Sequence, residues 1–185
     1  MARNASNTVR IIGGEWRSRV IRFPDASGLR PSPDRVRETL FNWLGQDLTG
    51  LACLDLFAGS GALGFEAASR GASSVVMVET AREAVAALRA NAKLLGAKSW
   101  RLAAGDALEF LRSHHGGLFD VVFVDPPFGS GLIERVLPLL PKVLAPGAQV
   151  YVESGKTLAV PEGWQLRRQG EAGVVHYHLM QRAQT

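Results

Sequence analysis

The sequence predicts a doubly wound α/β fold, in which a mostly parallel sheet carries helices on both faces. From Leu51 onward, short apolar runs of β type alternate with stretches that have helical periodicity. This alternation is typical of parallel strands joined by helical crossovers. A glycine-rich turn lies where the first strand should pass into the first helix. The 185 residues, 46% of them apolar, suffice for one such domain and exclude a largely disordered chain.

The N-terminal residues predict a small β-hairpin and one helix in front of this sheet. Runs at 9–12 and 19–23 flank a pair of glycines and form the expected hairpin. A helix is expected over 33–45, with Ser32 as its N-cap and Pro33 as its first residue. Its apolar residues repeat at helical spacing and form a stripe along one face.

Five strands and four helices are expected to build the main sheet and its covering layers. The strands are predicted at 51–57, 74–79, 100–104, 119–124 and 148–153, and the helices at 62–70, 81–95, 106–114 and 131–144. Runs at 165–169 and 174–181 flank a second glycine-containing turn and predict an antiparallel hairpin on one edge of the sheet. We therefore divide the chain into a basic N-terminal extension, residues 1–45, and a main domain, residues 46–185.

Positive charge is concentrated near the N-terminus. Residues 1–37 hold eight arginines and three acids, whereas the net charge of the whole chain is only +4. Arginine can bind phosphate through two parallel hydrogen bonds, so this block favours nucleic acid as the partner, although a solvated face would also explain it. Trp16 in the hairpin could contact RNA as well. The RNA-binding candidates lie in the hairpin and off the apolar stripe of the helix: Arg10, Arg17, Arg19, Arg35 and Arg37.

Composition excludes several functional classes. No apolar stretch approaches the roughly 20 residues that cross a bilayer, and the polar first ten residues do not resemble a secretory signal. The single cysteine, Cys53, cannot form an internal disulfide and suits a reducing cytoplasm, where we expect a monomer without a membrane partner. His176 and His178 share one face of a strand, but no cysteine or third ligand lies nearby, so no metal site is predicted.

The glycine-rich turn, residues 55–64 (DLFAGSGALG), is expected to bind the cofactor. Gly59, Gly61 and Gly64 fit the G-x-G-x-x-G pattern between a strand and a helix, which by itself suits NAD equally well. Asp55 precedes these glycines and would repel a pyrophosphate. The same acid suits S-adenosylmethionine, which has no phosphate and carries an ammonium group at its methionine end. The predicted cofactor contacts in this turn are Asp55, Phe57, Gly59, Ser60 and Gly61.

Two further acids follow the second and third predicted strands. Glu79 ends the second strand, where a carboxylate can accept hydrogen bonds from both ribose hydroxyls. Asp106, followed by Ala107, comes after the third strand and is placed to meet the adenine amino group. Both acids could instead be helix N-caps or first-turn charges. Three acids at three successive strand ends nevertheless favour a crevice that binds S-adenosylmethionine.

The segment after the fourth predicted strand, residues 125–128 (DPPF), carries the predicted catalytic chemistry. Two prolines fix the chain and leave carbonyl groups without local partners. Asp125 and the Pro126 carbonyl can each accept one N–H of a planar amino group, which directs the nitrogen lone pair at an electrophilic methyl group. Phe128 can stack on a flat acceptor. The alternative is a proline-rich turn that only ends a buried strand. It would explain the two prolines but not the whole segment. The catalytic candidates are Asp125, Pro126, Pro127 and Phe128.

Taken in order, these motifs resemble those of class I S-adenosylmethionine-dependent methyltransferases that act on amino groups. Residues 10–17 (RIIGGEWR), 29–42 (LRPSPDRVRETLFN) and 151–154 (YVES) resemble more specifically the bacterial 16S rRNA guanine-N2 methyltransferase family, RsmD. The similarity runs from about residue 9 to about residue 182. The chain departs from the family pattern at 32–33, a Ser-Pro pair, where the family more often has two threonines.

The resemblance implies a Rossmann-like class I methyltransferase sheet and methyl transfer from S-adenosylmethionine, without a metal, to N2 of one guanine. It also implies 16S rRNA as the partner, within the small ribosomal subunit or an assembly intermediate. The target base must lie in a loop or be flipped out, because an amino group inside a paired helix is unreachable.

Three other functions stay open on the residues alone. The same chemistry could act on adenine N6 or cytosine N4 in DNA, or on a protein glutamine amide, because each presents an amino group on a planar carbon. An NAD-dependent oxidoreductase fits the glycines but is disfavoured by Asp55 and by the lack of a tyrosine–lysine proton relay. A non-catalytic RNA-binding assembly factor fits the arginines but has no need of the segment 125–128.

Overall fold

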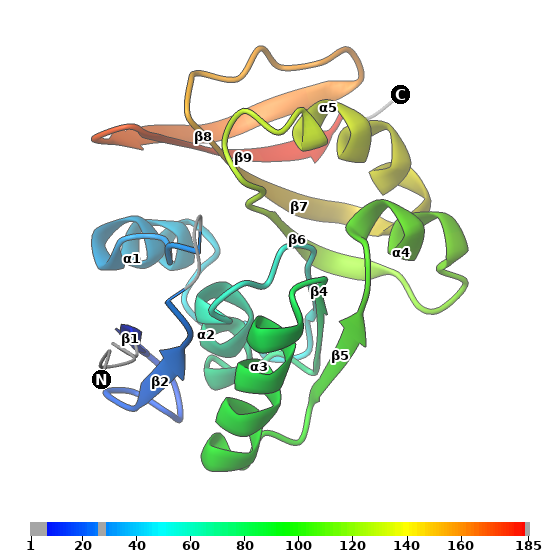
Figure 1. Cartoon of the computed structure of the whole chain (residues 1–185). Coiled ribbons are helices and arrows are strands. Elements are labelled where there is room, and N and C mark those ends of the chain that lie inside the picture. Colours follow the sequence, from blue (N-terminus) through cyan, green and yellow to red (C-terminus); the bar gives the residue numbers. More distant parts are fainter. Residues whose placement is uncertain (1–6, 26–28, 184–185) are drawn as a thin grey trace.

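A seven-stranded sheet forms the centre of the protein, as the computed structural model in Figure 1 shows; the structure describes residues 7–25 and 29–183. Its strands are β3 (Ala52–Asp55), β4 (Ser74–Glu79), β5 (Trp100–Ala104), β6 (Phe119–Val124), β7 (Leu144–Ser154), β8 (Trp164–Ala172) and β9 (Val175–Arg182). They lie in the order β5-β4-β3-β6-β7-β9-β8. The first five are parallel, whereas β9 runs antiparallel to β7 and β8 antiparallel to β9. The predicted mostly parallel sheet with an antiparallel C-terminal hairpin is confirmed.

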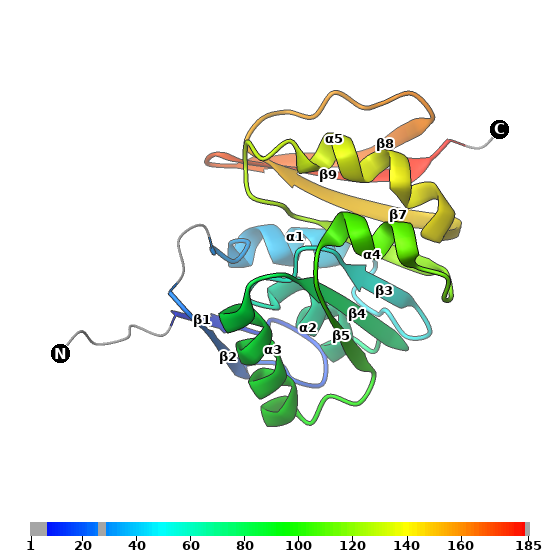
Figure 2. The ribbon, with the colours of Figure 1, turned by 45° about the vertical axis from the view of Figure 1, so that its right-hand side comes forward.

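Helices cover both faces of this sheet, as Figures 1 and 2 show. One face carries α1 (Asp34–Trp43), α2 (Ala62–Ser69) and α3 (Arg82–Leu95), and the other carries α4 (Ala107–Ser113), α5 (Leu132–Val136) and the 3-10 helix η1 (Leu137–Val143). A separate hairpin of β1 (Asn7–Arg10) and β2 (Val20–Phe23) precedes α1, so the predicted N-terminal hairpin and helix are present.

Side chains of the central strands alternate between two hydrophobic clusters, one on each face of the sheet. In β4, Val75 and Met77 join the cluster that contains α1 to α3, whereas Val76 and Val78 join the cluster that contains α4 and η1. All four are buried, which explains the unbroken apolar sequence of a parallel strand covered on both faces. Cys53 in β3 is buried as well, and burial raises its pKa to about 12, so the thiol is a packing group and not a nucleophile.

The N-terminal hairpin packs on the face that holds α2 and α3 and shares their hydrophobic cluster. Ile11 and Ile21 are buried there, and the Asn91 side chain of α3 bonds both backbone groups of Arg22 in β2, at 3.2 Å to the N–H and 2.7 Å to the carbonyl. Figure 2 shows the hairpin beside α3. Trp16 is also buried in this cluster, so the expectation that its ring contacts RNA is wrong.

A buried carboxylate, Glu66 of α2, fastens the extension to the main sheet. It accepts hydrogen bonds from the backbone N–H of Ile12 at 2.9 Å and of Gly13 at 2.8 Å, and from Arg70 Nε at 2.9 Å. Arg37 Nη1 lies 3.3 Å from the same carboxylate, and both side chains are fully buried. The prediction that Arg37 binds RNA is therefore wrong. Arg37 lies off the apolar stripe of α1, but its side chain points at the buried Glu66 carboxylate and not at solvent.

Two prolines explain where the last helical prediction fails. The expected single helix at 131–144 is instead the short α5 followed by the 3-10 helix η1, because Pro138 and Pro141 interrupt the α-helical hydrogen bonding. Strand β7 then begins at Leu144, before the expected start at 148. Within the described ranges, no helix is long and apolar enough to span a membrane.

Candidate active site

Acidic side chains stand at the carboxyl ends of all five parallel strands. In the spatial order of the sheet they are Asp106 after β5, Glu79 in β4, Asp55 in β3, Asp125 after β6 and Glu153 in β7. From β3 the chain crosses first to β4 on one side and later to β6 on the other, so this edge contains the switch point at which open α/β sheets bind ligands. The structure thus brings the predicted acids to one edge, together with Glu153.

The glycine turn allows α2 to close against the end of β3. Gly59 and Gly61 have φ of 54° and 83°, the left-handed region that side chains disfavour. A Cβ on Gly61 would lie 2.6 Å from the Phe65 ring, and one on Gly64 would lie 2.5 Å from Met77 Cε. The glycines therefore serve the tight turn and the close helix–strand packing that the motif predicts; their contact with a cofactor stays a prediction, as it does for Phe57 and the buried Ser60.

Asp55 is a buried carboxylate with one oxygen left over. Its Oδ2 accepts a 3.0 Å hydrogen bond from the Gly64 N–H, whereas Oδ1 is buried and has no hydrogen-bond partner among the residues that the structure describes. Burial, assisted by the charge of Glu79, raises the pKa of Asp55 to about 7. A cationic ligand group at Oδ1 would stabilise the ionised form, so the residue fits the ammonium group of S-adenosylmethionine.

Glu79 bridges the glycine turn and the start of α3. Its Oε2 accepts from the Gly59 N–H at 2.7 Å, and its Oε1 accepts from the N–H groups of Thr80 and Ala81, each at 2.9 Å. The carboxylate is half-buried and is held in a fixed orientation. Oε1 already accepts two hydrogen bonds, whereas Oε2 accepts one and can accept a second, so the predicted contact with the ribose is chemically open at Oε2.

Asp106 is the N-cap of α4. Its Oδ1 accepts a 2.9 Å hydrogen bond from the Glu109 N–H, and the side chain is exposed, with the buried Ala107 behind it. The helix-cap alternative therefore describes the local role of Asp106. Contact of the second carboxylate oxygen with adenine stays a prediction.

The turn after β6 exposes an aromatic ring beside a carboxylate. Asp125 is half-buried and Pro126 is buried, whereas Pro127 and Phe128 are exposed, with 46% of Phe128 accessible. A Cβ on Gly155 would lie 3.2 Å from the Phe128 ring, so this glycine, just after β7, leaves the space that the ring occupies. The turn can therefore present a flat apolar face and a hydrogen-bond acceptor to the same ligand.

Three residues that the sequence did not assign to the site surround Asp125. The hydroxyl of Ser32 lies 3.4 Å from Asp125 Oδ2 and donates a hydrogen bond to Glu153 Oε1, which also accepts a 2.7 Å hydrogen bond from the Tyr151 hydroxyl. Ser32 was expected to cap the helix, but α1 begins at Asp34 and has no side-chain cap. The signal that could have found Glu153 is its place at the end of the fifth strand, level with the other acids.

The remaining RNA-binding candidates are exposed. Arg10, Arg17, Arg19 and Arg35 all face solvent. The Arg19 guanidinium donates to the Leu94 carbonyl at 2.8 Å, so it lies where the hairpin meets the end of α3. A phosphate-binding role for these four side chains stays a prediction.

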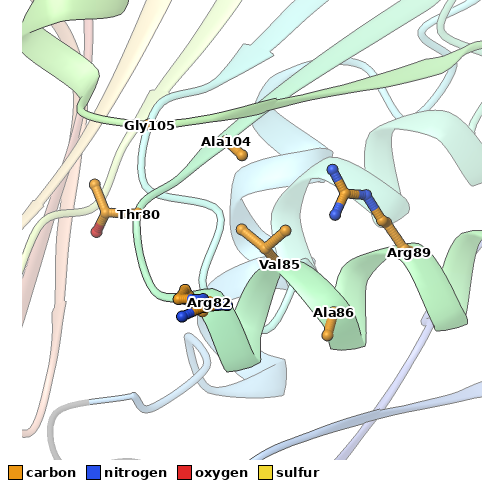
Figure 3. Close-up of a pocket in the computed structure, with 7 residues that line it drawn as sticks. All are labelled: Thr80, Arg82, Val85, Ala86, Arg89, Ala104 and Gly105. Carbon is orange, nitrogen blue, oxygen red and sulfur yellow. The ribbon is translucent and has the colours of Figure 1, made fainter.

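A pocket of about 440 Å³ lies between α3 and the end of β5, outside the turn that holds Asp125. Figure 3 shows its lining, in which Arg82 and Arg89 come from the same face of α3 as Val85. Neither arginine forms an ion pair with any described residue. The lining residues are Thr80, Arg82, Val85, Ala86, Arg89, Ala104 and Gly105. This pocket adds positive charge to the side of the molecule on which the hairpin packs.

Comparison with known proteins identifies the family. The family model described as "Conserved hypothetical protein 95" matches residues 9–181. The chain belongs to this family. It is 46% identical to ribosomal RNA small subunit methyltransferase D of Escherichia coli (strain K12) over 184 residues, which cover 97% of this chain and 92% of that protein. The Haemophilus influenzae protein of the same name is 43% identical, with 96% of each chain covered.

The solved structures agree with this family assignment. The structure of the methyltransferase yhhF from Escherichia coli has a TM-score of 0.86 and 46% sequence identity, and the match covers 95% of this chain and 98% of that one. The predicted resemblance to the RsmD family and the predicted class I methyltransferase sheet are therefore confirmed. Among the described residues, no three histidine, cysteine or acidic side chains are grouped so that they could hold a metal ion.

Proposed function

We propose that the protein transfers a methyl group from S-adenosylmethionine to the N2 amino group of a guanine in 16S rRNA. The observation that carries this proposal is the turn at residues 125–128, where a carboxylate and an exposed aromatic ring stand at the switch point of the sheet. The nearly full-length relatives named for small-subunit rRNA methylation support the choice of substrate. We further propose a cytoplasmic monomer that acts on the small subunit or on an assembly intermediate.

The residues at the ends of β3 and β4 fit S-adenosylmethionine, which supplies an electrophilic methyl group on a sulfonium centre when bound. Asp55 Oδ1 would accept a hydrogen bond from the ammonium group. Glu79 would accept from the ribose hydroxyls, and Asp106 with Ala107 would border the adenine. The backbone of residues 57–61 would line the space between these groups.

Asp125 and its neighbours would hold the acceptor. The Asp125 carboxylate and the Pro126 carbonyl each accept one N–H of the guanine amino group, which withdraws the nitrogen lone pair from conjugation. Phe128 stacks on the base, which must leave any paired helix to reach it. Because the reaction is a single in-line displacement, the main contribution of these residues is to position the nitrogen against the methyl carbon.

The exposed arginines would bind the RNA backbone around this turn. Arg10, Arg17, Arg19 and Arg35 have free access to solvent, and Arg82 and Arg89 at the pocket extend the same basic surface along α3. Bidentate contacts to phosphate would fix the register of the RNA without reading its sequence. Selection of one guanine would then rest on the shape of the RNA that reaches Phe128.

The test uses small ribosomal subunits whose 16S rRNA lacks the modification. They are incubated with the protein and methyl-labelled S-adenosylmethionine, and the RNA is digested to nucleosides. We expect label in N2-methylguanosine. Label in N6-methyladenosine, in N4-methylcytidine or in ribosomal protein would reject guanine N2 and point to another amino acceptor. A parallel incubation with deproteinised 16S rRNA tests whether the protein requires a ribonucleoprotein substrate.

A further inference from the structure

We propose that Glu153 is a positioning residue that, with Ser32 and Tyr151, prepares Asp125 to take up the proton that the amino group loses during methyl transfer. This inference rests on the proposed function and deepens it. Glu153 does not touch the substrate in this account and acts only through Asp125. Nothing in the chemistry assigned to residues 125–128 alone requires the other three residues.

The three residues form a buried hydrogen-bonded cluster behind Asp125. Ser32, Tyr151 and Glu153 have 4%, 0% and 3% of their surface exposed. One oxygen of Glu153, Oε1, accepts from both the Tyr151 hydroxyl and the Ser32 hydroxyl. The Ser32 oxygen also lies 3.4 Å from Asp125 Oδ2, so the single hydroxyl stands between the two carboxylates.

The sheet brings the two acids together. Strands β6 and β7 are parallel, with Phe123 opposite Tyr151 and Val124 opposite Val152, so the next residue of each strand end brings Asp125 beside Glu153. The charge of a carboxylate this close disfavours ionisation of its neighbour, so Glu153 raises the proton affinity of Asp125. A buried acid is a costly choice for packing alone, because a glutamine would accept the same two hydrogen bonds without a charge.

In the part of the chain that the structure describes, the charges that act on Asp125 and Tyr151 come from acids and a tyrosine. The titratable groups that face the pair of acids are Tyr151 in β7, Asp55 in β3 and, across β9, Tyr177, which pairs with Glu153. The guanidinium of Arg37 reaches the Ser32 carbonyl at 3.2 Å but is paired with other acids. Burial, then the charge of Glu153, raises the pKa of Asp125 well above its usual range. A raised pKa suits a carboxylate that must accept a proton.

The proton has a defined source. As the guanine nitrogen forms its bond to the methyl carbon, the carbon–sulfur bond breaks and its electron pair stays on sulfur. The nitrogen then carries one proton too many. Asp125, which already accepts an N–H from that nitrogen, takes the proton and later releases it to water. The negative charge of Glu153 strengthens Asp125 as a base, and the Ser32 hydroxyl can donate to either acid as the proton moves.

The test is the pH dependence of kcat for the full-length protein on unmodified small subunits, at saturating S-adenosylmethionine. Asp125 must be ionised to accept the amino group, so kcat falls at low pH. Glu153→Gln keeps both hydrogen bonds and removes the charge, which lowers the proton affinity of Asp125. We expect kcat at neutral pH to fall about tenfold, the acidic limb to move to lower pH, and the KM for S-adenosylmethionine to stay within twofold.

Ser32→Ala gives a shift of opposite sign. Loss of the hydroxyl removes a donor that stabilises ionised Asp125, so the acidic limb should move to higher pH. Glu162→Gln, at an exposed acid in the loop between β7 and β8, is the matched control and should change neither kcat nor the limb. If Glu153→Gln does not fold, judged by its thermal melt, Ser32→Ala decides the question.

Two results would overturn the proposal. One is a fall in kcat that is uniform across pH with unmoved limbs, which is the mark of a structural role. The other is wild-type kcat and profile in both variants. If the wild-type protein itself fails to methylate the subunits, the proposed function falls and this inference falls with it; if wild type is active and the limbs do not move, only this inference falls.

Discussion

A 3.0 Å hydrogen bond joins the backbone N–H of Gly64 in α2 to Oδ2 of Asp55, the last residue of β3. A Cβ at Gly64 would lie 3.2 Å from that same oxygen, so only glycine lets the helix approach the carboxylate this closely without a shift. The bond satisfies one carboxylate oxygen, whereas Oδ1 is buried and forms no hydrogen bond within residues 7–25 and 29–183. The glycine therefore fixes the orientation of the acid that we propose binds the ammonium group of S-adenosylmethionine.

The affinity for S-adenosylmethionine should rise with pH through the titration of Asp55. Its pKa is about 7, so the ionised fraction grows by roughly fifteenfold between pH 5.5 and 7. We expect the affinity measured by titration calorimetry to rise by a similar factor over this range. Asp55→Asn should bind more weakly at pH 7 and show no such rise. If the affinity of both proteins for S-adenosylmethionine depends on pH in the same way, Asp55 does not bind the ammonium group.

The same substitution should stabilise the protein at alkaline pH. The folded-state pKa of Asp55 lies above its unfolded value, so the wild-type protein loses stability as pH rises from about 4 to about 7. Asp55→Asn keeps an oxygen for the Gly64 N–H and escapes this loss. We expect its free energy of unfolding at pH 8 to exceed that of wild type by about 1–4 kcal/mol, and the difference to vanish near pH 4. Urea titrations at the two pH values measure it.

Glu79→Ala should weaken donor binding and leave RNA binding unchanged. The carboxylate contacts that we assign to two ribose hydroxyls are worth roughly 1.5–3 kcal/mol. Because Glu79 also holds the N–H groups of Gly59, Thr80 and Ala81, the alanine variant should melt at lower temperature as well. Glu79→Gln separates the two effects, since it retains acceptors for part of this bonding. Unchanged calorimetric affinity in both variants would restrict Glu79 to its structural contacts.

Arg37→Met should destabilise the fold without a specific effect on the salt dependence of RNA binding. Methionine fills much of the volume but leaves the buried Glu66 carboxylate without one of its two arginine partners. Removal of one member of a buried ion pair costs about 3 kcal/mol or more. Denaturant unfolding measures the loss. A variant as stable as wild type would show that Arg70 and the backbone donors suffice for Glu66.

Arg17→Ala and Arg35→Ala should weaken RNA binding at little cost in stability, because both side chains are exposed. If each contacts one phosphate, the slope of the logarithm of the binding constant against the logarithm of salt should drop by about 0.7–0.9 per variant. Point variants are preferable to deletion of the extension, since Ile11 and Ile21 belong to the core. Unaltered slopes in both variants would leave these arginines as a solvated face.

The strands of the sheet and the helices that cover it could be predicted from the sequence because burial determines the local pattern of apolar residues. A strand covered on both faces, such as β4, reads as an unbroken apolar run, and a helix covered on one face, such as α3, shows a stripe. The acids at the strand ends were predictable for the same reason, since the strand end itself is visible in the pattern. The 3-10 helix η1 was missed although Pro138 and Pro141 marked it.

Contacts between segments that are distant in the sequence could not be predicted. Ser32 reads as a helix cap, yet its partner Glu153 lies 121 residues away. The local pattern predicts that Arg37 faces solvent. Its guanidinium instead contacts Glu66 of α2, which lies 29 residues further along the chain. In both cases local periodicity fixes the backbone, while the identity of the opposing surface depends on the tertiary arrangement.

The role of Asp125 in methyl transfer is tested by a single-turnover comparison of wild type and Asp125→Ala on unmodified small subunits, paired with calorimetry of S-adenosylmethionine binding. Asp125 faces the acceptor in this account, and the donor-side acids are intact in the variant. We predict a 10²–10³-fold slower formation of N2-methylguanosine, which corresponds to ~3–4 kcal/mol of lost transition-state stabilisation, with donor affinity within twofold of wild type. An Asp125→Ala protein that forms N2-methylguanosine at the wild-type rate would contradict the assignment of this turn as the site of methyl transfer.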